Sequence, residues 1–133
     1  MELKDFLQRR NIHVALIQET KLRPTSKTPS FPGFTALRVD RPGDGGGGGL
    51  LALVSRALPF THTTAASLAS LPVDGVRELL SLTLRVDNSD LRLTNVYIPP
   101  SSSCPPGYSP DLSALSSFPQ HLLLGDFNAH DST

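Results

Sequence analysis

The stretch Leu122-Leu123-Leu124-Gly125-Asp126-Phe127-Asn128-Ala129-His130 decides the fold that this sequence predicts. Its leucines are typical of a buried strand, which leads through Gly125 to Asp126 and Asn128. Side chains two residues apart in an extended strand point to the same face, so this carboxylate and this amide are expected to converge. The carboxyl end of a strand is where an α/β sheet usually carries its active site. Because Gly, Asp and Asn also favour turns, a simple turn is the alternative for this segment.

The size and composition limit the class of protein. A chain of 133 residues with 38% hydrophobic residues and no net charge fits one domain with a modest core. No apolar run approaches the roughly 20 residues of a membrane span. The first turns contain Glu2, Lys4 and Asp5, which do not suit a signal peptide. We therefore expect an intracellular protein that does not bind membranes.

The charges are distributed unevenly along the chain. Residues 1–56 hold nine Lys or Arg and five Asp or Glu, whereas residues 57–133 hold three and seven. A basic half beside an acidic half would suit a polyanion that docks next to a cation site. The alternative is a set of scattered, solvated charges with no common role.

The amino-terminal third predicts a helix followed by a strand. Apolar residues recur at helical spacing over residues 1–10, and Asn11 suits the end of that helix. Residues 12–17 are apolar on both faces, which is typical of a central strand in a largely parallel sheet. Glu19 lies two residues after this strand, so it is either a site residue or the point where the chain returns to water.

Four more strands are expected in the middle of the chain. Strands over residues 34–39 and 50–55 flank a run of five glycines, which lacks the Lys-Ser/Thr of a phosphate-binding loop and predicts a hairpin connection or an insertion. Residues 76–86 and 91–98 alternate in polarity around a tight turn and predict a second hairpin. On its second arm, Asn95 and Tyr97 share a face near the strand end. A short helix is expected to begin at Ser109.

Three strand ends therefore carry polar side chains, and here the sequence resembles a known family. The motifs LIQET, GGGGGLLALVS, LTNVYIPP and LLLGDFNAH occur in the order found in the endonuclease/exonuclease/phosphatase superfamily, especially the apurinic-type endonuclease domain of non-LTR retrotransposons. The resemblance covers nearly the whole chain. It implies an α/β fold that is a partial four-layered sandwich, with two mixed β-sheets face to face and helices outside them.

The resemblance also implies roles for the residues at the strand ends. Glu19 would bind a divalent metal, Mg²⁺ or Mn²⁺, and Tyr97 would contact the scissile phosphate. Asp126 and Asn128 would activate or position the attacking water and hold the phosphate. One carboxylate can suffice for Mg²⁺, which keeps most of its waters. Further candidates for substrate binding are Asn95, Lys21, Arg23 and His130.

The function implied by the resemblance is a Mg²⁺-dependent DNA endonuclease. It would nick DNA in the nucleus to leave a 3′-hydroxyl, from which the reverse transcriptase domain of a parent polyprotein would prime. Cleavage at abasic sites is a second activity that the resemblance allows. The alternatives are an inactive retrotransposon remnant and a phosphatase or exonuclease of the same superfamily.

Two segments of the family pattern do not occur in this sequence. One is a first strand that carries an Asn, and the other is a final Asp-His pair. We therefore expect residues 1–133 to form a single, incomplete domain with impaired catalysis. Without its neighbour, the strand over residues 12–17 is expected to lie at a sheet edge.

Overall fold

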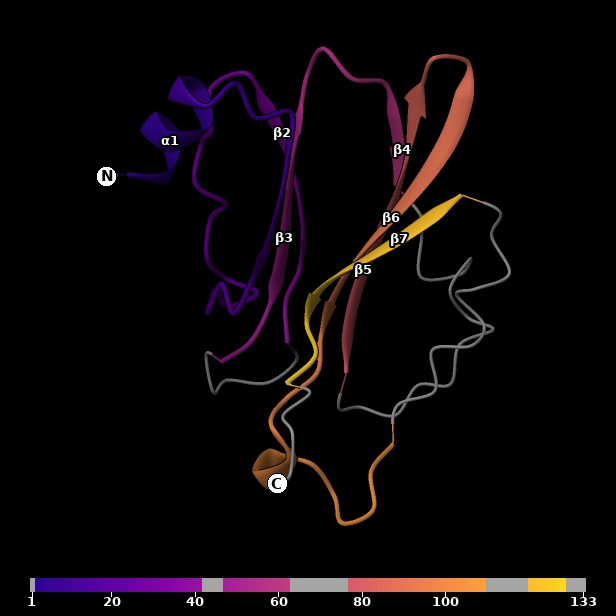
Figure 1. Cartoon of the computed structure of the whole chain (residues 1–133). Helices are drawn as coiled ribbons and strands as arrows, with labels where there is room; N and C mark the ends of the chain where they lie inside the picture. The colour runs from indigo at the N-terminus through magenta and orange to yellow at the C-terminus, as the bar shows by residue number, and fades with distance from the viewer. Residues whose placement is uncertain (1, 42–46, 63–76, 110–119, 129–133) are drawn as a thin grey trace.

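The computed structural model describes residues 2–41, 47–62, 77–109 and 120–128 (Figure 1). Within this part of the chain, two β-sheets and one α-helix form an α/β fold, as the sequence predicts. The elements in chain order are α1 (Leu3–Arg9), β1 (Val14–Gln18), β2 (Phe34–Val39), β3 (Leu50–Ser55), β4 (Phe60–His62), β5 (Glu78–Val86), β6 (Ser89–Tyr97), the 3₁₀ helix η1 (Ser101–Ser103) and β7 (His121–Asp126).

The first sheet has the strand order β1-β3-β2, and both of its pairings are antiparallel. The glycine run joins β2 to β3, so the predicted hairpin connection is confirmed. The prediction of a central strand in a largely parallel sheet is wrong for β1, which lies at the edge of this sheet. Its residues are apolar because both faces of the strand are covered. Ala15 and Ile17 pack toward Leu7 of α1. Val14 and Leu16 pack toward the second sheet. The edge position itself agrees with the expectation of an unpaired neighbour.

The second sheet has the order β4-β5-β6-β7. The β5–β6 hairpin is confirmed, and its turn residues Asp87 and Asn88 both have positive φ angles, 49° and 64°. Such a turn matches the right-handed twist of the strands. Strand β7 pairs with β6 in parallel, which makes this sheet mixed. Strand β4 follows β3 closely in the chain but pairs antiparallel with β5, so it belongs to the second sheet.

The two sheets pack face to face and enclose the main core (Figure 1). Alternate residues of three strands are buried there, from β3 (Leu50, Ala52, Val54), β5 (Leu80, Leu82, Leu84) and β6 (Leu93, Tyr97). Helix α1 covers the opposite face of the first sheet through Leu7, Leu51 and Leu53. The helix expected to begin at Ser109 falls largely on residues 110–119, which lie outside the described residues. No helix in the described part of the chain is long and apolar enough to cross a lipid bilayer.

Strand β7 is more exposed than its leucines predict. Leu122 and Leu124 are 48% and 46% exposed, so the expectation of a buried strand is wrong. The reason is that β7 is the edge of a four-stranded sheet that faces a sheet of three strands. Leu124 lines a groove of about 420 Å³ together with Val14 and Leu16 of β1.

Candidate active site

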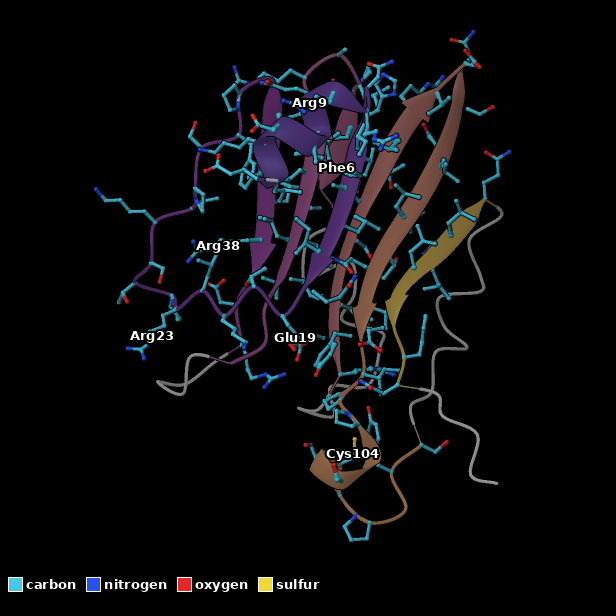
Figure 2. The ribbon with its side chains drawn as sticks, turned by 60° about the vertical axis from the view of Figure 1, so that its left-hand side comes forward. Phe6, Arg9, Glu19, Arg23, Arg38 and Cys104 are labelled. Atoms are coloured by element: carbon cyan, nitrogen blue, oxygen red, sulfur yellow. The ribbon has the colours of Figure 1, made fainter. Side chains whose placement is uncertain are left out.

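The ends of β1 and β6 meet through a tyrosine and a carboxylate. Glu19 follows the last residue of β1 with a φ of 53°, a backbone conformation that is uncommon for residues other than glycine. Tyr97 is the last residue of β6 and is only 6% exposed. Its hydroxyl donates a hydrogen bond of 3.0 Å to Oε1 of Glu19. Figure 2 shows Glu19 at the lower end of the first sheet, where β1 ends. The structure thus joins two predicted site residues that are 78 positions apart.

The parallel pairing of β6 and β7 brings Asp126 to the same end of the molecule. Asp126 lies opposite Tyr97 in the register, and Gly125 lies opposite Val96. A β-carbon at position 125 would overlap the backbone of Val96, so only glycine permits this approach of the two strands. The backbone N–H of Ile98 donates to the carbonyl of Asp126 over 2.8 Å and closes the strand end.

Asn128 is held by a turn that follows the end of β7. Its φ of 46° is left-handed, its backbone N–H donates to Oδ1 of Asp126 over 3.0 Å, and its Nδ2 donates to the carbonyl of Ile98 over 2.6 Å. Asp126 and Asn128 are therefore neighbours because of the turn. The prediction that an extended strand places them on one face is wrong, and the turn alternative is confirmed.

Asn95 supports the site from the core. Its side chain is fully buried, and its Nδ2 donates to the carbonyls of Ile17 and Leu51, over 3.0 and 3.3 Å. Its Oδ1 accepts a 2.5 Å hydrogen bond from Nε2 of Gln18, the residue before Glu19. Since these bonds use the amide group inside the protein, the structure gives Asn95 a supporting position instead of the substrate contact expected from the sequence.

The basic candidates lie in the loop after β1. The backbone N–H of Lys21 donates to the carbonyl of Gly48 over 2.8 Å, which ties the loop to the end of the glycine run. Lys21 is exposed two residues after Glu19. Arg23 is also exposed, but its side chain projects away from the sheets (Figure 2). His130 lies outside the described residues.

Arg41 and Glu78 also belong to this site, although the sequence did not single them out. Nη2 of Arg41 lies 3.0 Å from Oε2 of Glu78, and its guanidinium carbon lies 5.9 Å from the centre of the Tyr97 ring. The other carboxylate oxygen of Glu78 accepts a 2.6 Å hydrogen bond from the backbone N–H of Gly49. Glu78 lies opposite Tyr97 in the β5–β6 register, a relation that only the strand pairing reveals.

The surroundings of Tyr97 keep its hydroxyl protonated. Burial raises the pKa of Tyr97 above its ordinary value of 10.0, and the hydrogen bond to Glu19 raises it further. The negative charges of Glu19 and Asp126 act in the same direction, while Arg41 lowers the pKa. At neutral pH, Tyr97 can therefore serve as a hydrogen-bond donor, and it cannot serve as a base.

The oxygen donors suit a hydrated divalent cation. The described residues contain no cluster of three or more His, Cys, Asp or Glu that could enclose a metal. Glu19 and Asp126 are nevertheless exposed carboxylates at the same end of the sheets. Mg²⁺ commonly takes one or two protein carboxylates and keeps its waters, so this donor set fits such an ion and does not fit a metal enclosed by protein ligands.

The sequence matches no model of a known protein family and no curated protein.

Proposed function

We propose that this site hydrolyses phosphodiester bonds of DNA with the help of Mg²⁺ or Mn²⁺, as an endonuclease of the superfamily that the sequence resembles. The observation that carries the proposal is the meeting of Glu19, Tyr97, Asp126 and Asn128 at one end of the two sheets. They come from the ends of three strands and supply the residue types that phosphodiester hydrolysis requires. The proposal includes the four-layered sandwich, of which two sheets and one helix are described.

Asp126 is the group proposed to accept a proton from the attacking water. One of its oxygens accepts the backbone N–H of Asn128, and the residue is exposed, so the other oxygen is open to a water molecule. A carboxylate fixed in this way on a strand end can act as a general base. The turn thus gives Asp126 a defined orientation.

Tyr97 and Asn128 are proposed to hold the phosphate. The Tyr97 hydroxyl, protonated at neutral pH, can donate to a non-bridging oxygen once Glu19 is engaged with the cation. Preorganised donors of this kind stabilise the charge that develops during hydrolysis. A Mg²⁺ held by Glu19 would supply positive charge at the phosphate and the leaving oxygen.

A plasmid-nicking assay tests the proposal. Supercoiled DNA is incubated with the 133-residue chain in Mg²⁺, in Mn²⁺ and in EDTA, and open-circular product is measured. We expect metal-dependent nicking that Asp126→Asn lowers by at least about 100-fold, because general-base catalysis contributes about 10²–10⁴-fold. The matched control is Asp90→Asn, at the far end of the β5–β6 hairpin, which should nick like the unchanged protein.

An absence of nicking would contradict the proposal, and so would each of three further results. Nicking that persists in EDTA, or that is equal in Asp126→Asn and Asp90→Asn, would exclude this site as its source. Release of inorganic phosphate from DNA ends without nicking would indicate a phosphatase instead.

A further inference from the structure

We propose that Arg41 is an anion-binding residue of this site, whose guanidinium binds a phosphate oxygen of the DNA backbone beside Tyr97. Glu78 and the end of the glycine run hold the guanidinium in that position. The identity of the anion rests on the proposed function, but the geometry around Arg41 does not.

Arg41 is held from one side and open on the other. Its guanidinium lies over the Tyr97 ring and binds Glu78 through Nη2, while its side chain is 41% exposed. Glu78 is only 10% exposed, and both of its oxygens are bonded, to Arg41 and to the N–H of Gly49. A guanidinium has five N–H groups, and Glu78 accepts one hydrogen bond from Arg41 among the described residues. Within the described residues the other N–H groups have no hydrogen-bond partner, and those that are exposed can reach an anion at the surface.

The glycine run is shaped around this guanidinium. A β-carbon at Gly48 would lie about 2.5 Å from the guanidinium carbon of Arg41, and one at Gly47 would lie 3.3 Å from its Nη1. Gly48 and Gly49 also have φ angles of 67° and 95°, which glycine adopts without strain. Gly49 then presents its N–H to Glu78. Gly48 thus leaves the space that the guanidinium occupies, and Gly49 supports Glu78, which the hairpin interpretation of the run does not explain.

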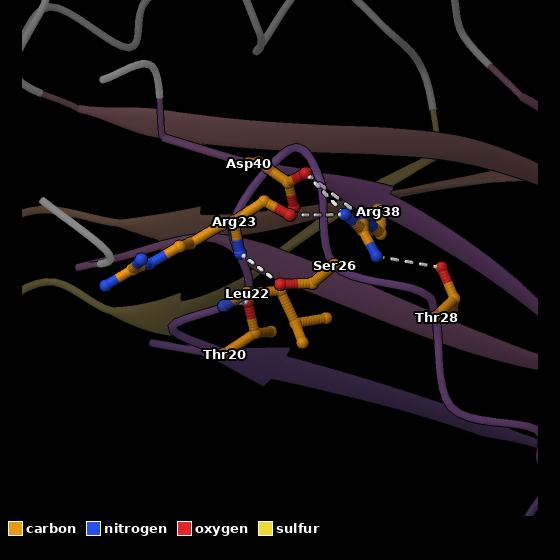
Figure 3. Close-up of polar contacts among 7 residues, drawn as sticks. All are labelled: Thr20, Leu22, Arg23, Ser26, Thr28, Arg38 and Asp40. Carbon is orange, nitrogen blue, oxygen red and sulfur yellow. Dashed lines mark hydrogen bonds and ion pairs between the residues drawn. The ribbon is translucent and has the colours of Figure 1, made fainter. Parts of the chain in front are cut away.

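Arg38 shows what a purely structural arginine looks like in the same chain. It donates twice to Asp40 and once each to Thr28 and the carbonyl of Arg23 (Figure 3). Four of its five N–H groups are therefore used, and its side chain is 16% exposed. Among the residues that the structure describes, Arg41 donates one hydrogen bond, and it is more exposed, so it can still bind a further acceptor.

The carboxylates around the site require a nearby positive charge if a phosphodiester is to bind. A phosphodiester that reaches Tyr97 also approaches the carboxylates of Glu19 and Asp126, which repel it. Arg41 is the cation that the structure places against the Tyr97 ring, and its planar fork suits phosphate oxygens. It would therefore offset that repulsion at the phosphate itself.

DNA binding measured without cleavage tests this inference. The affinity of the full chain for a short fluorescein-labelled duplex is measured by anisotropy in Ca²⁺, with urea unfolding of every variant as a check on folding. We expect Arg41→Ala to weaken binding by about tenfold or more, since a hydrogen bond to a charged group is worth about that factor. It should also reduce the slope of log affinity against log salt by about one. Arg85→Ala removes an arginine that is also paired at 3.0 Å, but at the opposite end of β5, and should weaken binding less than twofold.

A second pair of variants leaves the charge of Arg41 in place. Gly48→Ala should displace the guanidinium and weaken binding about as much as Arg41→Ala. Its matched control is Gly107→Ala, because Gly107 has a similar φ of 73° and no atom within 4 Å of an added β-carbon. Equal affinities of Gly48→Ala and Gly107→Ala for the duplex would overturn the inference, and so would equal affinities of Arg41→Ala and Arg85→Ala. A chain that does not bind duplex DNA would also overturn it.

The two proposals fail separately. Arg41-dependent binding by a chain that does not nick would contradict the proposed function and support the role of Arg41. Nicking by a chain whose affinity for DNA does not depend on Arg41 would support the proposed function and contradict the role of Arg41.

Discussion

The two ends of the β5–β6 hairpin carry the same kind of ion pair in different surroundings. At the turn end, Arg85 and Asp90 approach to 3.0 Å with side chains that are 54% and 62% exposed. At the open end, Arg41 and Glu78 approach to the same 3.0 Å, but Glu78 is 10% exposed and also binds the backbone of Gly49. One pair is solvated and local, whereas the other joins the two sheets beside Tyr97.

This difference shows that burial and backbone support decide what a charged pair can do. An exposed pair is screened by water and contributes little to stability or position. A supported pair holds its charge at one place, which a binding site needs. Left-handed backbone conformations occur at both ends, but those at the turn end belong to the tight hairpin turn, whereas Glu19 and Asn128 at the open end are candidate site residues.

The largest effect is expected from Gly125→Ala at the open end. The added β-carbon would meet the backbone of Val96, so β7 must move away from β6. We expect the free energy of unfolding to fall by about 3 kcal/mol, at the upper end for overpacking, measured by urea denaturation. At the turn end, Asn88→Gly should change it by less than about 1 kcal/mol, because glycine adopts positive φ readily. Equal midpoints for the two variants would show that β6 and β7 are not so closely paired.

A smaller loss is expected from Asn95→Ala. The substitution removes three hydrogen bonds that link both sheets and leaves the carbonyls of Ile17 and Leu51 without this donor. We expect a loss of about 2–3 kcal/mol in urea denaturation, the usual cost of buried groups left unsatisfied. Asn88→Ala, in the exposed turn, should cost about 1–2 kcal/mol for its left-handed backbone. A smaller loss for Asn95→Ala than for Asn88→Ala would contradict the supporting role of Asn95.

Double-mutant cycles compare the two ion pairs directly. Arg41 and Glu78 are each replaced by alanine, singly and together, and the same is done for Arg85 and Asp90. We expect a coupling energy of about 1 kcal/mol for the supported pair and about 0.3 kcal/mol for the exposed pair, both from urea denaturation. Added salt should reduce the second value more than the first. Identical coupling energies would remove the distinction between the two ends.

Much of the fold could be predicted because the spacing of apolar residues indicates which face of each strand is buried. The alternation of Leu80, Leu82 and Leu84 predicted their buried face, and the tight turn of the hairpin followed from its polar residues. The place of each strand in its sheet could not be predicted in this way. Strand β1 is apolar on both faces because α1 and the second sheet cover it, and a covered edge strand has the same pattern as a central one.

The site residues that lie in a sequence motif could be predicted. Those that only strand pairing brings to the site could not. Glu19, Tyr97 and Asp126 each follow or end a strand, so the sequence indicated that they could meet. The roles of Arg41 and Glu78 depend on strand register and on the space left by glycines, which no local pattern encodes. The turn at Asn128 was visible as an alternative, because the same residues favour strand ends and turns.

The smallest effect is expected on the pKa of Tyr97. This pKa should depend on Arg41 at the open end and not on Arg85 at the turn end. The pKa of Tyr97 is raised by burial and by Glu19, so the folded protein binds this proton more tightly than the unfolded chain does. Its contribution to stability is therefore complete below about pH 10 and is lost as the pH rises through the higher pKa of the folded state. In near-ultraviolet absorbance titrations, the difference between the unchanged protein and Tyr97→Phe should have its midpoint above 10.0.

The two arginines provide the control for this titration. Because Arg41 lowers the pKa of Tyr97, Arg41→Ala should move the difference titration to still higher pH. Arg85→Ala should leave it unchanged, since Arg85 lies at the turn end and binds Asp90. A midpoint at or below 10.0 would mean that Tyr97 is neither buried nor bonded to Glu19 in solution. An equal shift in both arginine variants would mean that Arg41 acts only through net charge, so a shift in Arg41→Ala alone would place its guanidinium at the Tyr97 ring.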